Sequence, residues 1–204
     1  MKLYWSSRSP YARKVMAFAH EAGLADRIET ARTLVSMTAP NRELMRVNPL
    51  AKIPTLITND GMVLYDSSVI CEYLDSLHAG EKLFPADPGR RWPALRWQAL
   101  GNNMLDNLVP WRNERLRPQA QQSPETIAAF DLKIRNAVAS LDTDADALAR
   151  TAVGIGHVVI AVALGYIDFR FSDLAWRQGG HRIAAWHETF AQRSSMQATL
   201  PVDA

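Results

Sequence analysis

The pattern of apolar and polar positions in the first eighty residues alternates between that of strands and that of amphipathic helices. Apolar residues three and four positions apart predict a first helix, which Gly23 ends. The pair Asp60-Gly61 predicts a hairpin. The predicted elements are a strand at 2–5, a helix at 10–22, a strand at 28–34, a short helix or turn at 41–47, strands at 54–58 and 62–65, and a helix at 67–77. This order, β-α-β-α-β-β-α, predicts a small α/β domain.

The pattern changes after a segment rich in proline and glycine at 84–89, and no strand is predicted beyond it. Residues 155–167 are apolar nearly all round and rich in β-branched side chains, but the length of this run favours a buried helix over a strand. Other helices are predicted around 97–111 with a bend at Pro110, from Pro124 on, and at 182–193. The predicted domains are 1–80 and an all-helical 90–204, joined by a linker at 81–89.

Composition and charge narrow the class of protein. Hydrophobic residues make up 48% of the 204 residues, which is ordinary for a globular protein with a sizeable core. The 23 basic and 21 acidic residues nearly balance, so a nucleic-acid partner is not expected. The N-terminus lacks a signal-peptide pattern and the longest apolar run, 158–164, is too short to cross a membrane. We therefore expect a cytoplasmic protein without a membrane partner.

Cysteine and histidine usage excludes several kinds of site. Cys71 is the only cysteine, which excludes an internal disulfide and a zinc site built from several cysteines. Its place among the apolar positions of the predicted helix at 67–77 indicates a buried, inert thiol. The five histidines are scattered without the spacing of metal ligands. No metal site is expected.

Two helix starts carry the candidate chemistry. Ser9 precedes Pro10, a pair typical of an N-cap followed by the first helical residue. A hydroxyl donor at a helix N-terminus would also lower the pKa of a bound thiol and so favour the reactive thiolate. Asp66 and Ser67 are expected to be the N-cap and first residue of the helix at 67–77. A role in capping this helix would alone explain why Asp66 and Ser67 occur at these two positions.

Four stretches, in this order and spacing, resemble the glutathione S-transferase superfamily. They are Ser-Pro-Tyr-Ala-Arg-Lys at 9–14, Asn-Pro-Leu-Ala-Lys-Ile-Pro at 48–54, the segment 65–74, and Ala-Leu-Gly-Tyr-Ile-Asp-Phe-Arg at 163–170. The resemblance covers nearly the whole chain and is to bacterial serine-type members. It implies a thioredoxin-like N-terminal domain followed by an all-α domain, with glutathione as co-substrate. It also implies a detoxifying enzyme and a homodimer, in which the N-terminal domain of one subunit contacts the helical domain of the other.

The resemblance gives Ser9 the role of contacting the glutathione sulfur. Ser6 and Ser7 are alternatives, because some classes of the family use a serine earlier in this loop. Redox-type relatives carry a cysteine where Ser9 stands, so disulfide exchange is not expected. The Ser9 hydroxyl would then both cap the helix and donate a hydrogen bond to the ligand.

The remaining glutathione contacts also follow from the resemblance. An X-Pro bond is usually trans, but the family implies a cis bond at Pro54, which turns the N–H and C=O of Ile53 toward the ligand. Lys52 either reaches a glutathione carboxylate or is simply solvated. Asp66 and Ser67 would bind the ammonium and carboxylate of the γ-glutamyl end.

Candidates for the electrophile pocket come from the same source. They are Tyr11, Asn103, Asp106 and Trp111, although the spacing of Trp111 is also that of a core residue. One departure from the family pattern stands out. Gly154 and His157 occupy the two positions of its Ser/Thr-x-x-Asp box, so the helix that follows is predicted to be poorly capped.

Two functions are consistent with these residues. The first is a transferase that adds the glutathione thiolate to a hydrophobic electrophile, with peroxidase or isomerase chemistry as further options of the same site. The second is a glutathione-binding regulatory or scaffold protein of the same fold with little or no turnover. Ser9, Ile53-Pro54, Asp66 and Ser67 favour the first or, at the least, glutathione binding.

Overall fold

The computed structural model describes residues 1–203 and divides the chain into two compact units. The first comprises residues 1–86 together with residues 194–203, and the second comprises 87–193. This differs from the predicted division, which assigned everything from residue 90 on to the helical domain. The reason is a short helix, α7 (Ser194–Gln197), which packs against α1 (Pro10–Glu21) and returns the C-terminal segment to the first unit.

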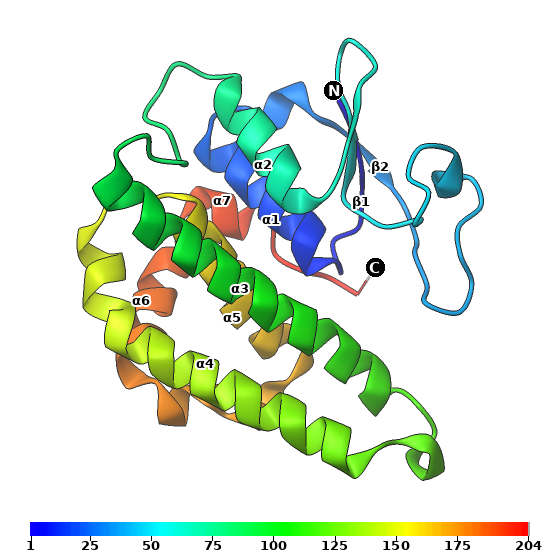
Figure 1. The fold of residues 1–204 in the computed structure, drawn as a ribbon, viewed down its shortest axis with the longest axis vertical. Coiled ribbons are helices and arrows are strands. Elements are labelled where there is room, and N and C mark those ends of the chain that lie inside the picture. The colour runs from blue at the N-terminus through cyan, green and yellow to red at the C-terminus, as the bar shows by residue number, and fades with distance from the viewer. Residues whose placement is uncertain (204) are drawn as a thin grey trace. The chain divides into compact units, whose positions relative to one another are not determined.

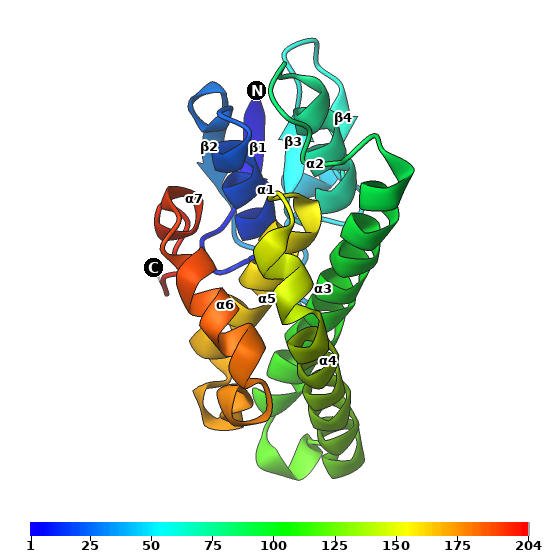
Figure 2. The same cartoon turned by 90° about the vertical axis from the view of Figure 1, so that its left-hand side faces the viewer.

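The first unit contains a four-stranded sheet in the order β2-β1-β3-β4, as Figure 2 shows. Its strands are β1 (Lys2–Trp5), β2 (Glu29–Arg32), β3 (Thr55–Ile57) and β4 (Val63–Leu64), and each lies within a predicted run. The pair β1 and β2 is parallel because helix α1 provides the crossover, and the other two pairs are antiparallel. The predicted thioredoxin-like arrangement is confirmed.

Each face of this sheet has its own cover. Helices α1 and α2 (Ser67–Ser76) lie on one face, where Leu3 and Leu56 are fully buried (Figure 2). Tyr4 packs on a smaller cluster of Leu44, Ala51 and Ile53, which the long β2–β3 connection supplies. Side chains alternate along a strand, so Leu3 and Tyr4 serve opposite faces. A 3-10 helix, η2 (Leu44–Arg46), forms where a short helix or turn was predicted.

The second unit consists of helices, labelled in Figure 1. They are α3 (Pro88–Arg115), α4 (Pro124–Arg150), α5 (Ile155–Arg170) and α6 (His181–Ala191). Further 3-10 helices of the chain are η1 (Ala25–Arg27), η3 (Gln119–Gln121), η4 (Ser172–Leu174) and η5 (Trp176–Gly179). The bend expected at Pro110 does not interrupt α3, which continues through two exposed prolines to Arg115. Within residues 1–203, no helix is long and apolar enough to cross a membrane.

Helix α5 forms the core of the second unit and is the buried helix that its length predicted. Two glycines allow α3 and α5 to approach each other closely. A Cβ atom on Gly156 would lie 2.7 Å from the Cβ of Trp97, and one on Gly101 would lie 2.8 Å from Val159. The close packing of these two helices therefore requires the smallest residue on either side of the contact.

The start of α5 corrects the prediction of a poor cap. Gly154 has no side chain to offer, but the Nδ1 atom of His157 accepts the N–H of Gly154 at 3.1 Å. The Nε2 atom of the same ring therefore carries the hydrogen and donates it toward the carbonyl oxygen of Leu148, 3.1 Å away. Thr151 Oγ1 is also 3.2 Å from Nε2. Histidine thus replaces the family's acid and in addition ties α5 to the end of α4.

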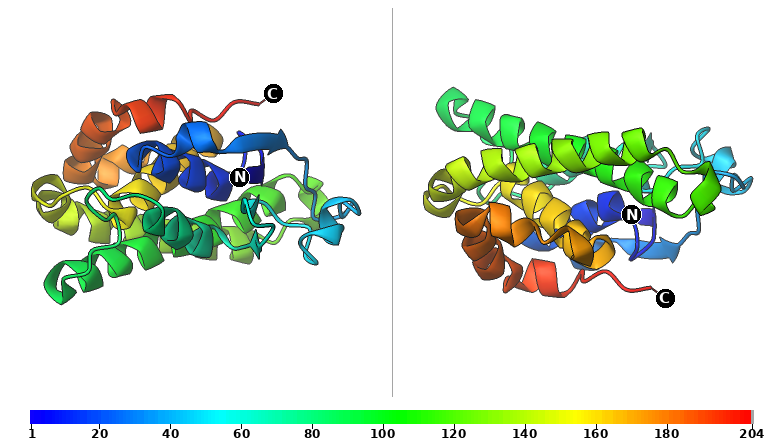
Figure 3. Two further views of the ribbon diagram at one scale, coloured as in Figure 1. Left: turned by 90° about the horizontal axis from the view of Figure 1, so that it is seen from above. Right: turned by 90° about the horizontal axis from the view of Figure 1, so that it is seen from below.

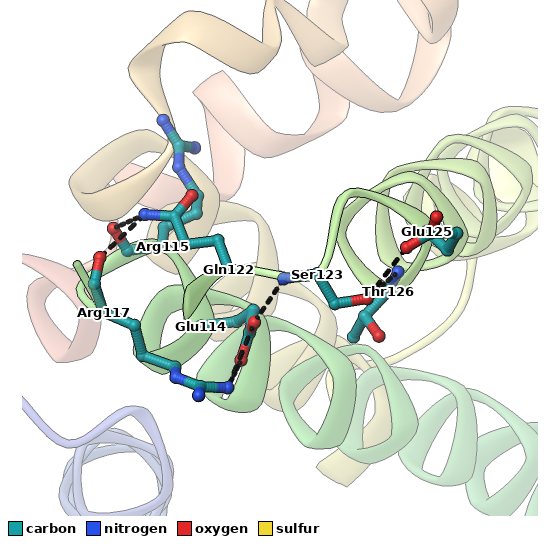
Figure 4. Close-up of polar contacts among 7 residues, drawn as sticks. All are labelled: Glu114, Arg115, Arg117, Gln122, Ser123, Glu125 and Thr126. Carbon is teal, nitrogen blue, oxygen red and sulfur yellow. Dashed lines mark hydrogen bonds and ion pairs between the residues drawn. The ribbon is translucent and has the colours of Figure 1, made fainter. Parts of the chain in front are cut away.

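The corner between α3 and α4 is closed by side chains (Figure 4). Glu114 accepts the N–H of Ser123 at 2.8 Å and a guanidinium hydrogen of Arg117 at 3.2 Å. These contacts, with that from Ser123 the largest, lower the pKa of the Glu114 carboxyl. Ser123 caps α4, since its Oγ accepts the N–H of Thr126 at 3.2 Å. The corner fixes α3 and α4 as neighbouring helices, which Figure 3 shows side by side.

Candidate functional site

The loop between β1 and α1 carries the first candidate residue. Ser9 is the N-cap of α1, as predicted, and its Oγ accepts the N–H of Ala12 at 3.3 Å. Its own N–H donates to the carbonyl oxygen of Ser6 at 3.0 Å, which closes the loop into a tight turn. The side chain is only partly buried. Ser9 therefore stands at the positive end of the α1 dipole, with a side chain that is not fully buried.

The three serines of this loop use their hydroxyls differently. Ser6 is buried, and its Oγ accepts the N–H of Arg8 at 3.3 Å. The Ser7 hydroxyl donates to the carbonyl oxygen of Val202 at 3.1 Å. The Ser9 hydroxyl acts only as an acceptor among the residues that the structure describes, so its hydrogen can be donated elsewhere.

The turn before β3 contains a cis peptide bond between Ile53 and Pro54, as the resemblance implied. Ala51 has a φ of 49°, a left-handed conformation that few residues other than glycine adopt. Asn48, which is 2% exposed, organises this turn. Its amide donates to the carbonyl oxygen of Lys52 at 3.1 Å and to Thr55 Oγ1 at 2.9 Å.

Sequence reasoning had missed Asn48 as a positioning residue. The available signal was the Asn-Pro pair that opens the segment, because asparagine side chains commonly fold back onto the following backbone in turns. The part of this turn that matters for the candidate site is the backbone of Ile53. Within residues 1–203, no group hydrogen-bonds to its N–H or C=O, whereas the adjoining β3 is paired on both sides. The side chain of Lys52 is exposed.

The start of α2 provides the second candidate helix terminus. Asp66 is its N-cap, as predicted, and the Oδ1 atom accepts the N–H of Ser68 at 2.8 Å. Asp66 is exposed, Ser67 is buried, and the peptide bond between Tyr65 and Asp66 is cis. Lys14 of α1, fully buried, lies 3.4 Å from Ser68 Oγ and so joins α1 to the first turn of α2.

The only cysteine of the chain does not have the properties of a reactive thiol. Cys71 lies within α2 and is completely buried. Burial raises the pKa of its thiol to about 12, and the nearby charge of Lys14 only partly opposes this shift. The thiol therefore stays protonated at neutral pH, and the prediction of an inert cysteine is confirmed.

The four electrophile candidates lie in different settings. Tyr11 is partly buried on α1 of the first unit. Asn103 and Asp106, three residues apart on α3 of the second unit, are both exposed on one helix face. Trp111, further along α3, is 4% exposed. Its ring centroid lies 4.7 Å from that of Phe171 and 6.4 Å from that of Phe130, so it belongs to the aromatic core of the helical unit.

Two further features of the described residues bear on the site. In residues 1–203, no group of three or more His, Cys, Asp or Glu side chains is arranged to hold a metal ion. An open hollow of about 480 Å³ in the first unit is lined by the residues where β1 begins and β3 ends, including Met1, Arg27 and Asn59. None of the candidate residues lines it.

Comparison with known proteins agrees with this picture. The model of the glutathione S-transferase N-terminal domain matches residues 8–77. The GST-like protein YibF of Escherichia coli is 29% identical over 203 residues, which cover 98% of each chain. The crystal structure of a glutathione transferase family member from Pseudomonas fluorescens, with bound glutathione, is 40% identical with a TM-score of 0.95 and 98% coverage of both chains.

A second crystal structure from Pseudomonas fluorescens contains bound S-(propanoic acid)-glutathione. It is 39% identical, with a TM-score of 0.90, and covers 99% of this chain and 100% of that one. These similarities extend over the complete fold rather than over the N-terminal domain alone. The chain belongs to the glutathione S-transferase superfamily, and the resemblance drawn from its motifs is confirmed.

Proposed function

We propose that the protein is a glutathione transferase, which stabilises the glutathione thiolate and adds it to a hydrophobic electrophile. The observation that supports this most directly is the geometry of Ser9. Its oxygen accepts the N–H of Ala12, and its hydrogen is left to donate to a ligand sulfur. One hydroxyl can therefore cap α1 and bind a thiolate at the same time.

The proposed chemistry begins with loss of the thiol proton to solvent. A hydrogen bond from Ser9 and the field of the α1 N-terminus both favour the anion over the neutral thiol, which lowers the pKa of bound glutathione. The thiolate then forms a bond from sulfur to an electrophilic carbon. Either a leaving group departs with the electron pair or the adduct takes up a proton from solvent.

The rest of glutathione would be held by groups that cap or end elements of the first unit. The backbone of Ile53 is suited to pair with the cysteinyl backbone of the ligand, in the manner of an added strand. Exposed Asp66 suits the γ-glutamyl ammonium, and Ser67 with the first N–H groups of α2 suits its carboxylate. Lys52 is exposed and could reach the glycine carboxylate.

A carbon–sulfur bond is favoured over disulfide exchange for three reasons. Ser9 stands where redox-type relatives carry a cysteine, and the chain's own Cys71 is buried with a pKa of about 12. The relative from Pseudomonas fluorescens was solved with bound S-(propanoic acid)-glutathione, in which the sulfur is bonded to carbon as in a thioether and not to a second sulfur as in a disulfide. The resemblance makes Tyr11 of the first unit, and Asn103 and Asp106 of the second, proposed electrophile contacts, whereas Trp111 packs with Phe171 and Phe130 in the helical unit.

The experiment measures glutathione affinity by calorimetry, the pKa of the bound thiol by thiolate absorbance, and turnover with an aromatic halide. Ser9→Ala should raise that pKa by about one to two units, because a charged hydrogen bond is worth roughly 1.5–3 kcal/mol and one unit equals about 1.4 kcal/mol. Turnover at neutral pH should fall in proportion, while affinity should change little.

Ser123→Ala is the matched control, because Ser123 also caps a helix with its Oγ but does so at α4. Both variants should lose roughly 1 kcal/mol of stability, and only Ser9→Ala should change the thiol pKa. Loss of turnover in Ser6→Ala instead of Ser9→Ala would move the role to Ser6. Tight binding without turnover towards any electrophile would favour the regulatory or scaffold function.

The proposal also includes the cellular location and the oligomeric state of the protein. We infer a cytoplasmic homodimer, since the cytoplasm keeps thiols reduced and the family assembles in pairs. Light scattering should return a mass near twice the 22.8 kDa of one chain. A mass equal to that of a single chain over the working concentration range would exclude the dimer.

A further inference from the structure

The segment that follows α7 contacts the loop that carries Ser9. We propose that residues 194–202 form a strap that holds the β1–α1 loop, and that Ser7 is the positioning residue through which the strap keeps the Ser9 hydroxyl aimed at the thiol. The hydrogen bond from Ser7 Oγ to the carbonyl oxygen of Val202, 3.1 Å long, joins the two. The role in catalysis rests on the proposed function.

The base of the strap is firmly attached to α1. Ser195 Oγ donates to the Glu21 carboxylate near the end of α1. The Arg13 guanidinium, almost fully buried, donates to the carbonyl oxygen of Met196 at 3.4 Å. Ser195, Met196 and Thr199 are themselves buried. Burial of these side chains and the two polar contacts fix the direction in which the chain leaves α7.

The tip of the strap, residues 200–202, is less firmly attached than its base. The side chains of Leu200 and Val202 are 53% and 51% exposed, so they contribute little packing. The contact to the loop uses a backbone carbonyl, which any residue at position 202 would supply. Pro201 restricts the backbone just before that carbonyl, which lowers the entropy lost when the tip is ordered. Figure 1 shows the segment that follows α7 running toward the connection from β1 to α1.

The geometry of the loop explains why Ser7 should matter for its neighbour two residues away. Inside the loop, Ser6 closes the turn: its carbonyl accepts the N–H of Ser9 and its Oγ accepts the N–H of Arg8. Ser6 Oγ bonds within the loop and Ser9 Oγ bonds the first turn of α1, whereas the Ser7 hydroxyl bonds the distant C-terminal segment. Without that bond the turn would be restrained from the inner side only, and the Ser9 hydroxyl would spend less time in its productive position.

The expected effect follows from the worth of a neutral hydrogen bond, about 0.5–1.5 kcal/mol, which corresponds to roughly a two- to tenfold change in an equilibrium. Ser7→Ala should therefore lower turnover at neutral pH about two- to tenfold and raise the pKa of bound glutathione by up to about one unit. Glutathione affinity should barely change, because most of the proposed ligand contacts lie at Ile53, Asp66 and Ser67.

The experiment compares Ser7→Ala, a truncation after Leu200, and the two combined. All three should show the same loss, because each removes the same bond. Ser7→Thr keeps the hydroxyl and should restore turnover. A chain lacking only Ala204 keeps Val202 and is the matched control. Full turnover in the truncated chain, or losses that simply add in the combined variant, would overturn the strap.

Hydrogen exchange of the amides at residues 6–12, measured without glutathione, separates this inference from the proposed function. Exchange should accelerate about two- to tenfold in Ser7→Ala and in the truncated chain, but not in Ser7→Thr. Unchanged exchange would overturn the strap even in an active transferase. A parent chain that binds no glutathione would instead refute the proposed function, and the exchange rates would then decide alone whether the strap holds the loop.

Discussion

Helices α1 and α2 of the first unit and helices α5 and α6 of the second unit begin in different ways. α1 and α2 begin at Ser9 and Asp66, and the oxygen of each side chain accepts a backbone N–H of its own first turn at 3.3 Å and 2.8 Å. α5 and α6 begin at Gly154 and Gly180, which have no side-chain oxygen. Their caps are borrowed from other residues.

The borrowed caps come from some distance along the chain or from inside the helix. At α5 the acceptor is His157, three residues into the helix. At α6 the Oδ1 atom of Asp142, on α4, accepts the N–H groups of Arg182 and Ile183 at 2.7 Å and 3.0 Å. A side chain at position 180 would not fit, because a Cβ there would lie 2.7 Å from Val138 Cγ1.

This difference separates two uses of a helix N-terminus. A start that carries its own cap can remain accessible, so its remaining donors and its dipole are available to a ligand. A start packed against other helices has no space for a cap of its own, and a neighbour must satisfy its N–H groups. The first arrangement suits the proposed glutathione site, and the second suits the core of the helical unit.

The largest expected effect tests the borrowed cap of α5. His157→Leu should lower the free energy of unfolding by about 3 kcal/mol, because it leaves the N–H of Gly154 and the carbonyl of Leu148 buried without these bonds. His181→Leu, which changes an exposed histidine at the first position of α6, is the control and should have little effect. Urea unfolding measures both. Equal stability of the two variants would contradict the cap.

The second prediction concerns the start of α2. Asp66→Ala and Ser67→Ala should each weaken glutathione binding by about tenfold or more, because charged hydrogen bonds are worth roughly 1.5–3 kcal/mol. The pKa of the thiol in the saturated complex should hardly move, since the γ-glutamyl end lies far from the sulfur along the ligand. Calorimetric titration decides the matter. Asp87→Ala, which removes the N-cap of α3, controls for the loss of a cap.

Unchanged affinity in both α2 variants would mean that Asp66 and Ser67 serve only the helix. In that case the comparison between ligand-facing and packed helix starts would no longer hold for α2. The role of Ser9 would then have to stand on the thiol pKa alone.

The third prediction tests the cap that α4 lends to α6. Asp142→Ala should destabilise the protein by about 1–2 kcal/mol, the usual cost of losing a helix cap. Asp131→Ala on the same helix removes an exposed ion pair with Arg135, 2.8 Å long, and should cost no more than about 0.5 kcal/mol. Thermal unfolding measures the loss of stability in each of the two variants. Similar losses would show that Asp142 is not a cap.

The same distinction explains what the sequence could predict. Signals confined to a few neighbouring residues were sufficient for Ser9-Pro10, for the Asp60-Gly61 hairpin and for the length of α5. The acceptor role of His157 was missed because its ring also needs Leu148 at the end of the preceding helix. The link from Asp142 to α6 spans forty residues and has no local signature.

Long-range packing also limited the prediction of the site. The motifs that resemble those of the family gave the candidate residues. Asn48 was overlooked because its two acceptors depend on the fold of the whole turn. The return of α7 to the first unit was missed because four residues are too few for a recognisable helical period. Pairings of this kind become visible only once the elements are packed.

The smallest expected effect concerns Gly154. A missing N-cap oxygen would ordinarily suggest a gain of about 1 kcal/mol on adding one, but glycine is itself a tolerable cap and differs from serine by only a few tenths. Gly154→Ser should therefore stabilise the protein by at most a few tenths of a kcal/mol, since the serine Oγ would accept the N–H of residue 157 and leave the bond from the Gly154 N–H to the His157 ring in place. Adding His157→Asp should make the protein less stable than the parent, since aspartate keeps an acceptor but loses the donor to Leu148. A double variant more stable than the parent in urea unfolding would show that α5 is poorly capped after all.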